Sequence, residues 1–480
     1  MIPTSTDPET LAEVRELPSG CTPESVWQCL AALPHCIFFD SAAPHTKHGR
    51  YSFVAADPFE RLVQPRAGTD IFALLRSRLA DMATPRLPDL PPFQGGWAGV
   101  FGYELGQAFE TYPCARFDEF AFPVAVIAGY DVVFAFDHSC DRAWIISQGL
   151  PETEPSARKR RARKRLEQFW ELATASETPL PSTNLEEDRL DISTLAPQFP
   201  THFGSDITST FSRADYEAAV ARVIEYIRDG DVFQVNLSQR LLAPQRLSSV
   251  ELYQRLRRRN PAPFAAYFDA GPFQILSASP ERFLRVHDRV VHTHPIKGTR
   301  FRSPHVEADL FAADDLLASS KDRAENTMIV DLLRNDLSRV CRDDSIFVET
   351  LCGLQRYQFV QHLVSVVRGE LREGADALEL LAVAFPGGSI TGAPKIRAME
   401  IIAELEPTVR GPYCGSLAYL GLDGSFDSSI LIRTITAGRG WCQIPVGGGI
   451  VADSRPTEEY EETCHKARGL VEVVSGYRER

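Results

Sequence analysis

Paired cysteines, long apolar runs and an excess of basic charge are all missing from this chain of 480 residues. Its ten cysteines are scattered without a CxxC pair, so the sequence indicates neither a zinc site nor a redox motif. At this length such cysteines are typical of the reduced thiols of a cytoplasmic protein. No apolar run approaches the roughly 18 residues of a membrane span, and the first residues do not resemble a signal peptide. We therefore expect a cytoplasmic protein that does not contact a membrane.

The charge balance excludes a further class of protein. A net charge of −13 and an isoelectric point near 5.4 argue against nucleic-acid binding. One segment departs from this balance, because seven of the eight residues from Arg158 to Arg165 are basic. Nucleic-acid or lipid binding is one interpretation of it. Acidic residues flank the segment on both sides, however, which favours a solvated helix face.

Hydrophobic patterning divides the chain into three regions, which we expect to form one composite body. Residues 1–148 alternate short β-rich runs with turns, and the dense glycines at 95–102 would let two backbones approach closely. Residues 149–209 hold the basic helix and a linker rich in Pro, Ser and Thr at 178–184. Residues 210–475 are the most densely patterned part.

The periodicity predicts individual elements. A helix begins at Ser212–Asp215, with Tyr216, Val220 and Val223 on its apolar face, and a second helix covers residues 321–339. Because helices and strand runs are segregated along the chain, an α+β fold is favoured over a regular βαβ winding. The expected strands are 36–39, 51–55, 124–127, 131–136, 232–237, 273–277 and 289–293.

Lys297, in the segment from His294 to Arg300, is the first candidate for chemistry. Pro, Ile, Gly and Thr surround it in the sequence, so we expect its side chain to be partly withdrawn from water. Burial disfavours the ammonium form of a lysine and leaves a nucleophilic amine, which can serve in covalent catalysis. The alternative is a strand-end lysine bound to a carbonyl or carboxylate, and this segment alone leaves both open.

Two groups of carboxylates lie on predicted helices. Glu325 follows Asp322 by three positions at the start of the helix 321–339. Near the C-terminus Glu459, Glu462 and Lys466 fall at i, i+3 and i+7, which places two acids and one amine on a single helical face. Glutamates from two helices could jointly hold Mg²⁺, which prefers one or two protein carboxylates together with waters and substrate oxygens. Two surface helices carrying ion pairs are the alternative.

Glycine clusters lie between these two groups, at 387–392 and 447–449. The first is not a P-loop, because Ala393 stands where the Lys-Ser/Thr of that motif should begin. Such runs can still present backbone N–H groups to a carboxylate. Arg433, in a strand-like run, has a planar fork that suits a bidentate carboxylate contact. A tight hairpin and a structural arginine are the alternatives.

Together these segments resemble the chorismate-utilising enzymes, a family that includes anthranilate, aminodeoxychorismate, isochorismate and salicylate synthases. The resemblance covers about residues 210 to 475 in family order, and the N-terminal region shares it around residues 39–53. It implies a fold of two large, mostly antiparallel β-sheets packed face to face with helices outside. The matching segments are 230–238, 277–283, 322–336, 387–399, 447–454, 459–466, 39–41 and 49–53.

The resemblance also implies roles for individual residues. Lys297 would attack chorismate, and Glu281 would be the general acid that protonates the leaving hydroxyl group, with a pKa raised by burial. Glu325 and Glu462 would hold Mg²⁺ against the ring carboxylate, with support from Glu459. The expected substrate contacts are Gly298, Thr299, His362, Ser389, Tyr413, Arg433, Gly447, Gly449 and Lys466.

Two positions separate the reactions within the family. Isochorismate synthases are expected to carry a water-activating lysine where this chain has Gln234, which disfavours that reaction. Anthranilate synthases typically read Pro-Ile-Ala-Gly-Thr, whereas Lys297 stands in the alanine position here, as in aminodeoxychorismate synthase component I. The resemblance therefore implies amination of chorismate at C4 to 4-amino-4-deoxychorismate, for 4-aminobenzoate and folate biosynthesis. Anthranilate synthase component I and a non-catalytic, tryptophan-binding regulatory subunit are the alternatives.

The resemblance further implies two partners. No cysteine lies in a nucleophile-elbow setting with a His/Glu pair, so ammonia would come from a separate glutamine amidotransferase subunit, component II. A bound tryptophan would regulate the enzyme or serve structure alone, or the pocket would be an empty relic. The residues that resemble the family's tryptophan pocket are Asp40, Ser41, Tyr51, Ser52, Pro263, Phe264 and Ala265.

Overall fold

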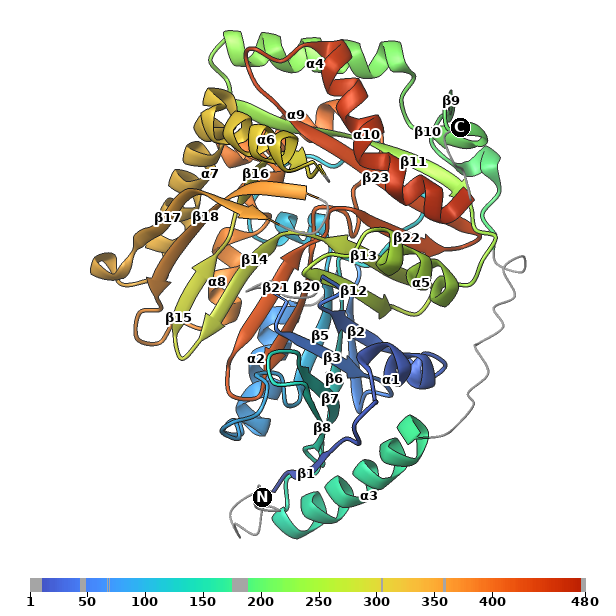
Figure 1. The fold of residues 1–480 in the computed structure, drawn as a ribbon, viewed down its shortest axis with the longest axis vertical. Helices are drawn as coiled ribbons and strands as arrows, with labels where there is room; N and C mark the ends of the chain where they lie inside the picture. The colour runs from blue at the N-terminus through green and yellow to red at the C-terminus, as the bar shows by residue number, and fades with distance from the viewer. Residues whose placement is uncertain are drawn as a thin grey trace.

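Two large antiparallel sheets pack face to face in the computed structural model (Figure 1). The structure describes residues 11–43, 49–66, 68, 70–174, 189–303, 305–356 and 360–475. The predicted α+β fold with two facing sheets and helices outside is confirmed. The division at 148 and 209 stays a prediction, and the expected linker 178–184 lies outside the described residues.

The larger sheet has thirteen strands in the described residues, and it joins the N-terminal region to residues 210–475 where β2 pairs with β12. Its strands in spatial order are β1 (Glu13–Glu16), β8 (Arg142–Ser147), β7 (Val132–Asp137), β3 (Tyr51–Ala55), β2 (Ile37–Asp40), β12 (Phe264–Asp269), β13 (Phe273–Ser279), β22 (Thr434–Gly438), β23 (Trp441–Ile450), β11 (Gln234–Pro244), β10 (Gly204–Ser209) and β9 (Phe199–Thr201), with β19 (Gly392–Ala393) beside β11.

The smaller sheet has ten strands in the same part of the chain, and it too mixes N-terminal with C-terminal segments. Its strands in spatial order are β16 (Ile296–Phe301), β18 (Val360–Glu370), β15 (Val290–Thr293), β14 (Arg282–His287), β21 (Phe426–Ile430), β20 (Ser416–Gly421), β5 (Gly96–Phe101), β6 (Ala125–Tyr130) and β4 (Glu60–Gln64), with β17 (Phe347–Arg356) beside β18. The glycines of β5 do allow close approach, since a Cβ on Gly99 would lie 2.1 Å from the carbonyl oxygen of Val126 on β6.

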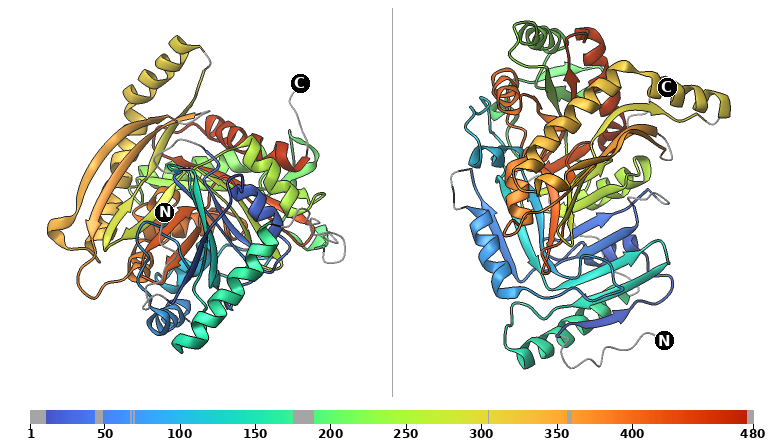
Figure 2. Two further views of the ribbon diagram at one scale, coloured as in Figure 1. Left: turned by 60° about the horizontal axis from the view of Figure 1, so that its bottom comes forward. Right: turned by 90° about the vertical axis from the view of Figure 1, so that its left-hand side faces the viewer.

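Helices cover the outer faces of both sheets, as the two further views show (Figure 2). None of the described helices is long and apolar enough to cross a bilayer. The helices are α1 (Pro23–Leu30), α2 (Ile71–Met82), α3 (Pro155–Thr174), α4 (Arg213–Arg228), α5 (Ser249–Arg259), α6 (Val306–Ala318), α7 (Ser320–Ser338), α8 (Ala377–Ala384), α9 (Lys395–Leu405) and α10 (Pro456–Ser475), with short 3₁₀ turns η1 (Tyr103–Ala108), η2 (Ile192–Thr194), η3 (Asp343–Ser345) and η4 (Gly388–Ile390).

The predicted helices begin where their capping residues stand. Ser212 caps α4 by accepting a hydrogen bond from the backbone N–H of Asp215, and Tyr216, Val220 and Val223 are buried as expected. Between the sheets, side chains such as Phe53 and Val126 form a shared core. Burial of each such side chain stabilises the fold by about 1.5–3 kcal/mol.

The basic helix α3 corrects the sequence interpretation. Arg158 is buried and donates from Nε to the carbonyl oxygen of Gln148 at 2.8 Å. Arg165 pairs with Asp57 at 2.7 Å and with Asp131 at 3.2 Å. The interpretation of the whole segment as a solvated face is therefore wrong for these two arginines, which fasten α3 to the body.

Candidate active site

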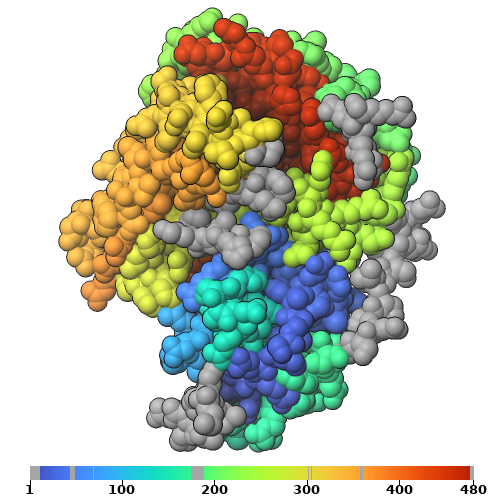
Figure 3. All heavy atoms as spheres, in the orientation of Figure 1, coloured from blue at the N-terminus to red at the C-terminus, as the bar shows by residue number. Residues whose placement is uncertain are grey.

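A cavity of about 550 Å³ collects the residues that the sequence singled out. Of the residues predicted for catalysis, metal and substrate, all but Glu459 line this cavity. Most of them come from β16, α7, β18, the turn η4, β23 and α10. Three lie in connections: Glu281 between β13 and β14, Tyr413 between α9 and β20, and Arg433 between β21 and β22. The two helices α7 and α10 both contribute side chains to the cavity, although more than a hundred residues separate them in the sequence. The segments of α6 and α10 lie on the same face of the molecule (Figure 3).

Lys297 stands at an irregular point of β16. The register of β16 against β18 shifts between Lys297 and Thr299, and the intervening Gly298 has φ of +72°. A Cβ on Gly298 would lie 2.7 Å from Leu316 and 2.9 Å from Asp322, so only glycine fits there. This shift turns Lys297 toward the cavity, where its side chain is 12% exposed and its Nζ donates to the carbonyl oxygen of Ser389 at 3.3 Å. The expected withdrawal from water is present.

Glu281 lies in the same wall and is 4% exposed. Burial raises the pKa of Glu281 to about 7, against the opposing effects of a hydrogen bond with Ser389 and of the nearby charge of Lys297. A carboxyl group in this environment keeps its proton near neutral pH and can donate it. The geometry therefore gives Glu281 the property that a general acid needs.

His362 on β18 is buried beside these groups. Burial lowers the pKa of His362 to about 4, so the imidazole is neutral at neutral pH. Its Nδ1 lies 2.9 Å from the hydroxyl of Thr299. His362 can therefore orient Thr299 without adding a charge to the cavity.

Two lysines pair with two carboxylates in the cavity. Lys466 Nζ lies 2.5 Å from Glu462 Oε1 on the same face of α10, and Lys297 Nζ lies 4.0 Å from Glu325 Oε2. Chiefly because of Lys466, the pKa of Glu462 is lowered, whereas burial raises the pKa of Glu325. Glu459 stands behind the cavity wall, where it accepts a hydrogen bond from Ser454 at 2.6 Å. A Cβ on Gly448 would lie 3.4 Å from Glu459 Oε2, 3.5 Å from Glu462 Oε1 and 3.6 Å from Lys466 Nζ, so the three side chains lie on one face of α10 as predicted.

The carboxylates fit a divalent cation held by two protein groups. A Cβ placed on Gly448 would lie 3.5 Å from Glu462 Oε1, and one on Gly449 would lie 3.6 Å from Glu325 Oε2. These glycines therefore leave room for both acids beside one stretch of β23. The described residues contain no group of three His, Cys, Asp or Glu side chains arranged for a metal. Mg²⁺ needs only one or two protein carboxylates when substrate and water supply the other oxygens.

Arg433 corrects one expectation. It lies between β21 and β22, outside both strands, with φ of +53°. Its Nη1 donates to the carbonyl oxygen of Lys466 at 2.7 Å, so the guanidinium contacts the middle of α10. Tyr413 lines the same part of the cavity.

Sequence reasoning missed several lining residues. Lys321, on the first turn of α7, lies 3.6 Å from Glu459 and so links α7 with α10. Asn236 and His465 also line the cavity. All three residues fall inside segments that the sequence analysis singled out, namely 321–339, 230–238 and 459–466, so their positions in those segments were the only available signal.

A second cavity, of about 260 Å³, contains most of the residues assigned to a tryptophan pocket. Asp40, Ser41, Tyr51, Pro263, Phe264 and Ala265 line it. Ser52 does not; it is buried, and its hydroxyl accepts from the backbone N–H of Ser41 at 3.1 Å.

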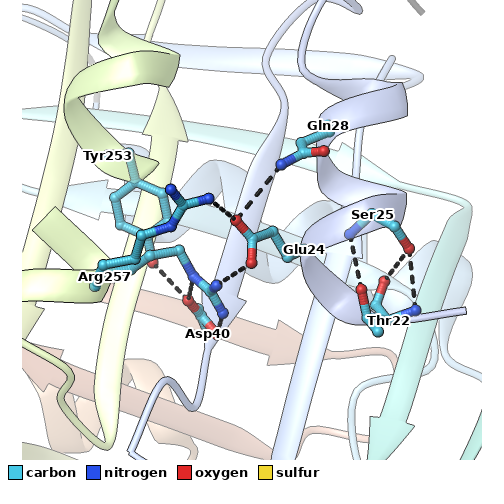
Figure 4. Close-up of polar contacts among 8 residues, drawn as sticks. Thr22, Glu24, Ser25, Gln28, Asp40, Tyr253 and Arg257 are labelled. Carbon is cyan, nitrogen blue, oxygen red and sulfur yellow. Dashed lines mark hydrogen bonds and ion pairs between the residues drawn. The ribbon is translucent and has the colours of Figure 1, made fainter. Parts of the chain in front are cut away.

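The carboxylate of Asp40 is already engaged in this second cavity. Arg257 donates to it from Nε at 2.8 Å and Tyr253 from its hydroxyl at 3.2 Å (Figure 4). Arg257 also pairs with Glu24 on α1. The acid that borders this cavity is therefore neutralised by the protein itself.

Comparison with known proteins agrees with this geometry. Residues 34–472 match the family described as chorismate binding enzyme, and the chain belongs to that family. It is 39% identical over 430 residues to anthranilate synthase component 1 of Streptomyces coelicolor, which covers 88% of this chain and 81% of that one. It is 37% identical over 453 residues to aminodeoxychorismate synthase component 1 of Salmonella typhimurium, covering 92% and 93%. The crystal structure of anthranilate synthase component I from Streptococcus pneumoniae superposes with a TM-score of 0.73 at 30% identity, covering 89% of this chain and 93% of that one.

Proposed function

We propose that this chain aminates chorismate at C4 to give 4-amino-4-deoxychorismate, the reaction of aminodeoxychorismate synthase component I. The observation that carries this proposal is Lys297, whose amine faces the cavity between Glu281 and Glu325. A lysine in this position supports a covalent route that an alanine cannot follow. Sequence identity supports the family and not the product, because this chain is 39% identical to an anthranilate synthase component 1 and 37% identical to an aminodeoxychorismate synthase component 1.

The reaction would begin with loss of the 4-hydroxyl group. The Lys297 amine, after losing a proton, attacks C2 of chorismate and forms a C–N bond while the ring double bonds shift. The C4–O bond breaks, and Glu281 gives its proton to the leaving oxygen, which departs as water. Removing the leaving group as water rather than hydroxide is what a protonated Glu281 contributes.

The second half of the reaction would restore the lysine. Ammonia attacks C4, the double bonds shift back, and the bond from C2 to Lys297 breaks. Two moderate steps thus replace one difficult displacement. The product keeps the enolpyruvyl group, which distinguishes it from anthranilate.

The remaining residues would bind and orient the substrate. Arg433, Tyr413 and the backbone N–H of Gly449 would hold the enolpyruvyl carboxylate. Glu325 and Glu462 would hold Mg²⁺, with Glu459 in support. When bound, the ion would screen the ring carboxylate and withdraw electron density from the ring. The ring side would be formed by Gly298, Thr299, His362, Ser389, Gly447 and Lys466.

Ammonia would come from a glutamine amidotransferase subunit. The named relatives are both designated component 1, which is consistent with a second component for this chain.

The second cavity would take a tryptophan molecule, with Tyr51 and Phe264 beside its ring. Titration calorimetry with tryptophan tests this, and Tyr51→Ala should weaken binding by about tenfold. Absence of heat with the wild-type protein would remove tryptophan from the account.

Anthranilate synthase is the second candidate, since the Streptomyces relative carries that name at 39% identity. Product analysis separates the two. Incubation with chorismate, Mg²⁺ and excess ammonium should give 4-amino-4-deoxychorismate, which becomes 4-aminobenzoate only after an aminodeoxychorismate lyase is added. Anthranilate formed without a lyase would overturn the assignment of the product and leave the cavity as a chorismate site.

A further inference from the structure

A buried guanidinium outside the cavity joins the segments that form its walls. Arg410 is 2% exposed and lies behind the cavity, in the link between α9 and β20. Its Nη1 donates to the carbonyl oxygen of Ile390 at 2.9 Å, and its Nη2 donates to that of Asn236 at 2.6 Å. Ile390 and Asn236 both line the cavity, from η4 and β11 respectively. One side chain therefore bridges two walls, in addition to the backbone hydrogen bond from the N–H of Asn236 to the carbonyl oxygen of Thr391 at 2.8 Å.

Two buried glutamates hold Arg410 in this position. Glu406 accepts from Nε at 2.9 Å and from Nη2 at 2.7 Å, and it also accepts from the backbone N–H of Ser238 at 2.8 Å. Glu104, from η1, accepts from the backbone N–H groups of Arg410 and Gly411 at 2.8 and 2.9 Å. The guanidinium is thus bound at Nε, Nη1 and Nη2, and Glu104 of the N-terminal region holds the backbone of Arg410.

The two walls carry groups of the proposed chemistry. Ser389, adjacent to Ile390, makes the hydrogen bond to Glu281 and accepts from Lys297 through its carbonyl oxygen. On the other wall, Asn236 and Ser238 pair in register with Gly449 and Gly447 of β23. A shift of either wall would move the general acid or the carboxylate-binding backbone.

We propose that Arg410 is a positioning residue of the chorismate cavity, held by Glu406 and Glu104, that sets the spacing between β11 and η4. A lysine in its place would keep the positive charge but not the planar fork that reaches two carbonyl oxygens and a carboxylate at once. A displacement of about 1 Å among reacting groups can lower a rate about 100-fold. The inference rests on the proposed function only where chorismate turnover is measured.

Arg410→Lys tests this inference, with Arg240→Lys as the matched control. Arg240 is also buried on β11 and pairs with a glutamate, at 2.5 Å from Glu119, but it binds Glu119 and Gln443, neither of which lines the cavity. Hydrogen exchange followed by mass spectrometry should show about tenfold faster exchange at 234–238 and 387–393 in Arg410→Lys, the effect of one lost hydrogen bond. The control should leave exchange at 387–393 unchanged.

Turnover gives the second readout. Arg410→Lys should lower kcat/KM for chorismate consumption about 100-fold and should move the alkaline limb of the kcat profile to higher pH, because the hydrogen bond from Ser389 opposes the raised pKa of Glu281. Arg240→Lys should not move that limb. If Arg410→Lys does not fold, Glu406→Gln, which weakens the hold on the same guanidinium, takes its place.

The two readouts distinguish a failure of the proposed role of Arg410 from a failure of the proposed function. A wild-type protein that consumes no chorismate would refute the proposed function, and exchange at 387–393 would still decide the role of Arg410. The inference would be overturned if Arg410→Lys exchanged hydrogen at 234–238 and 387–393 at the wild-type rate and kept the alkaline limb of its kcat profile at the wild-type pH. So would equal changes in Arg240→Lys, which would reduce Arg410 to a general stabilising residue.

Discussion

The two cavities of this molecule differ in how their charges are satisfied. In the second cavity Asp40 is bound by Arg257 and Tyr253, so its charge is compensated before any ligand arrives. In the larger cavity the acids and lysines face a shared space, and Glu281 is buried without a cation in contact. Burial raises the pKa of both acids, but the bonds from Arg257 and Tyr253 oppose the rise in Asp40, whereas the pKa of Glu281 reaches about 7. A carboxyl group with a pKa near neutrality suits proton transfer, and an acid held by a guanidinium suits a structural role.

Removal of Lys297 should have the largest effect, and it tests most directly whether the larger cavity is the one that carries out the chemistry. Lys297→Ala should lower chorismate amination by about 1,000-fold or more, because the nucleophile is lost. Steady-state assays with saturating ammonium measure this. Lys297→Arg is the matched control, since it keeps the positive charge without a free amine. Restored amination in Lys297→Arg would mean that the lysine acts through its charge.

Replacement of Glu281 should follow in size. Glu281→Gln should lower kcat about 100-fold, the usual contribution of a general acid. In the wild-type enzyme Glu281 must carry a proton to act, and its pKa is about 7. At a constant concentration of free ammonia, kcat should therefore fall as pH rises above about 7, and Glu281→Gln should abolish that limb. A limb that persisted in the variant would assign the acid to another residue.

The second cavity should respond in stability and not in turnover. Arg257→Met would leave Asp40 buried without its cation and should lower the free energy of unfolding by about 3–5 kcal/mol, measured by urea denaturation. Turnover per folded molecule at saturating chorismate should stay unchanged. A loss of kcat comparable to that of Glu281→Gln would contradict the separation of the two cavities.

The carboxylates for which we propose Mg²⁺ binding should show the smallest change. Glu462→Gln should raise the Mg²⁺ concentration for half-maximal activity by about tenfold, because one of two carboxylates is lost. Glu458→Gln, on the exposed side of α10 beside Arg455, is the matched control and should leave it unchanged. Equal Mg²⁺ dependence in both variants would remove Glu462 from the set of ligands.

Local patterns predicted most of the elements that surround the cavity. The apolar face of α4 and the i, i+3, i+7 face of α10 followed from helical spacing, and the grouping of Lys297 with Glu325 followed from the resemblance. Contacts between distant segments could not be predicted this way. Arg257 and Asp40 are 217 positions apart, and no periodicity relates them.

The errors share a physical cause. The sequence places Arg433 in a strand-like run, but the residue lies between β21 and β22 with φ of +53°, and its guanidinium contacts the α10 backbone. The sequence places Arg165 on a solvated helix face, yet it pairs with Asp57 and Asp131, which lie in the turns after β3 and β6. In both cases tertiary contacts decided what local sequence could not.

The central claim is that Lys297 forms a bond with the ring of chorismate, and trapping that bond tests it most directly. The wild-type protein, mixed with chorismate and Mg²⁺ without ammonium, would be quenched in acid at short times and digested for mass spectrometry. The account predicts a peptide containing Lys297 that has gained chorismate less one water, and no such peptide from Lys297→Ala. A protein that aminates chorismate with ammonium, yet carries no adduct at any quench time or carries it on another lysine, would contradict the account.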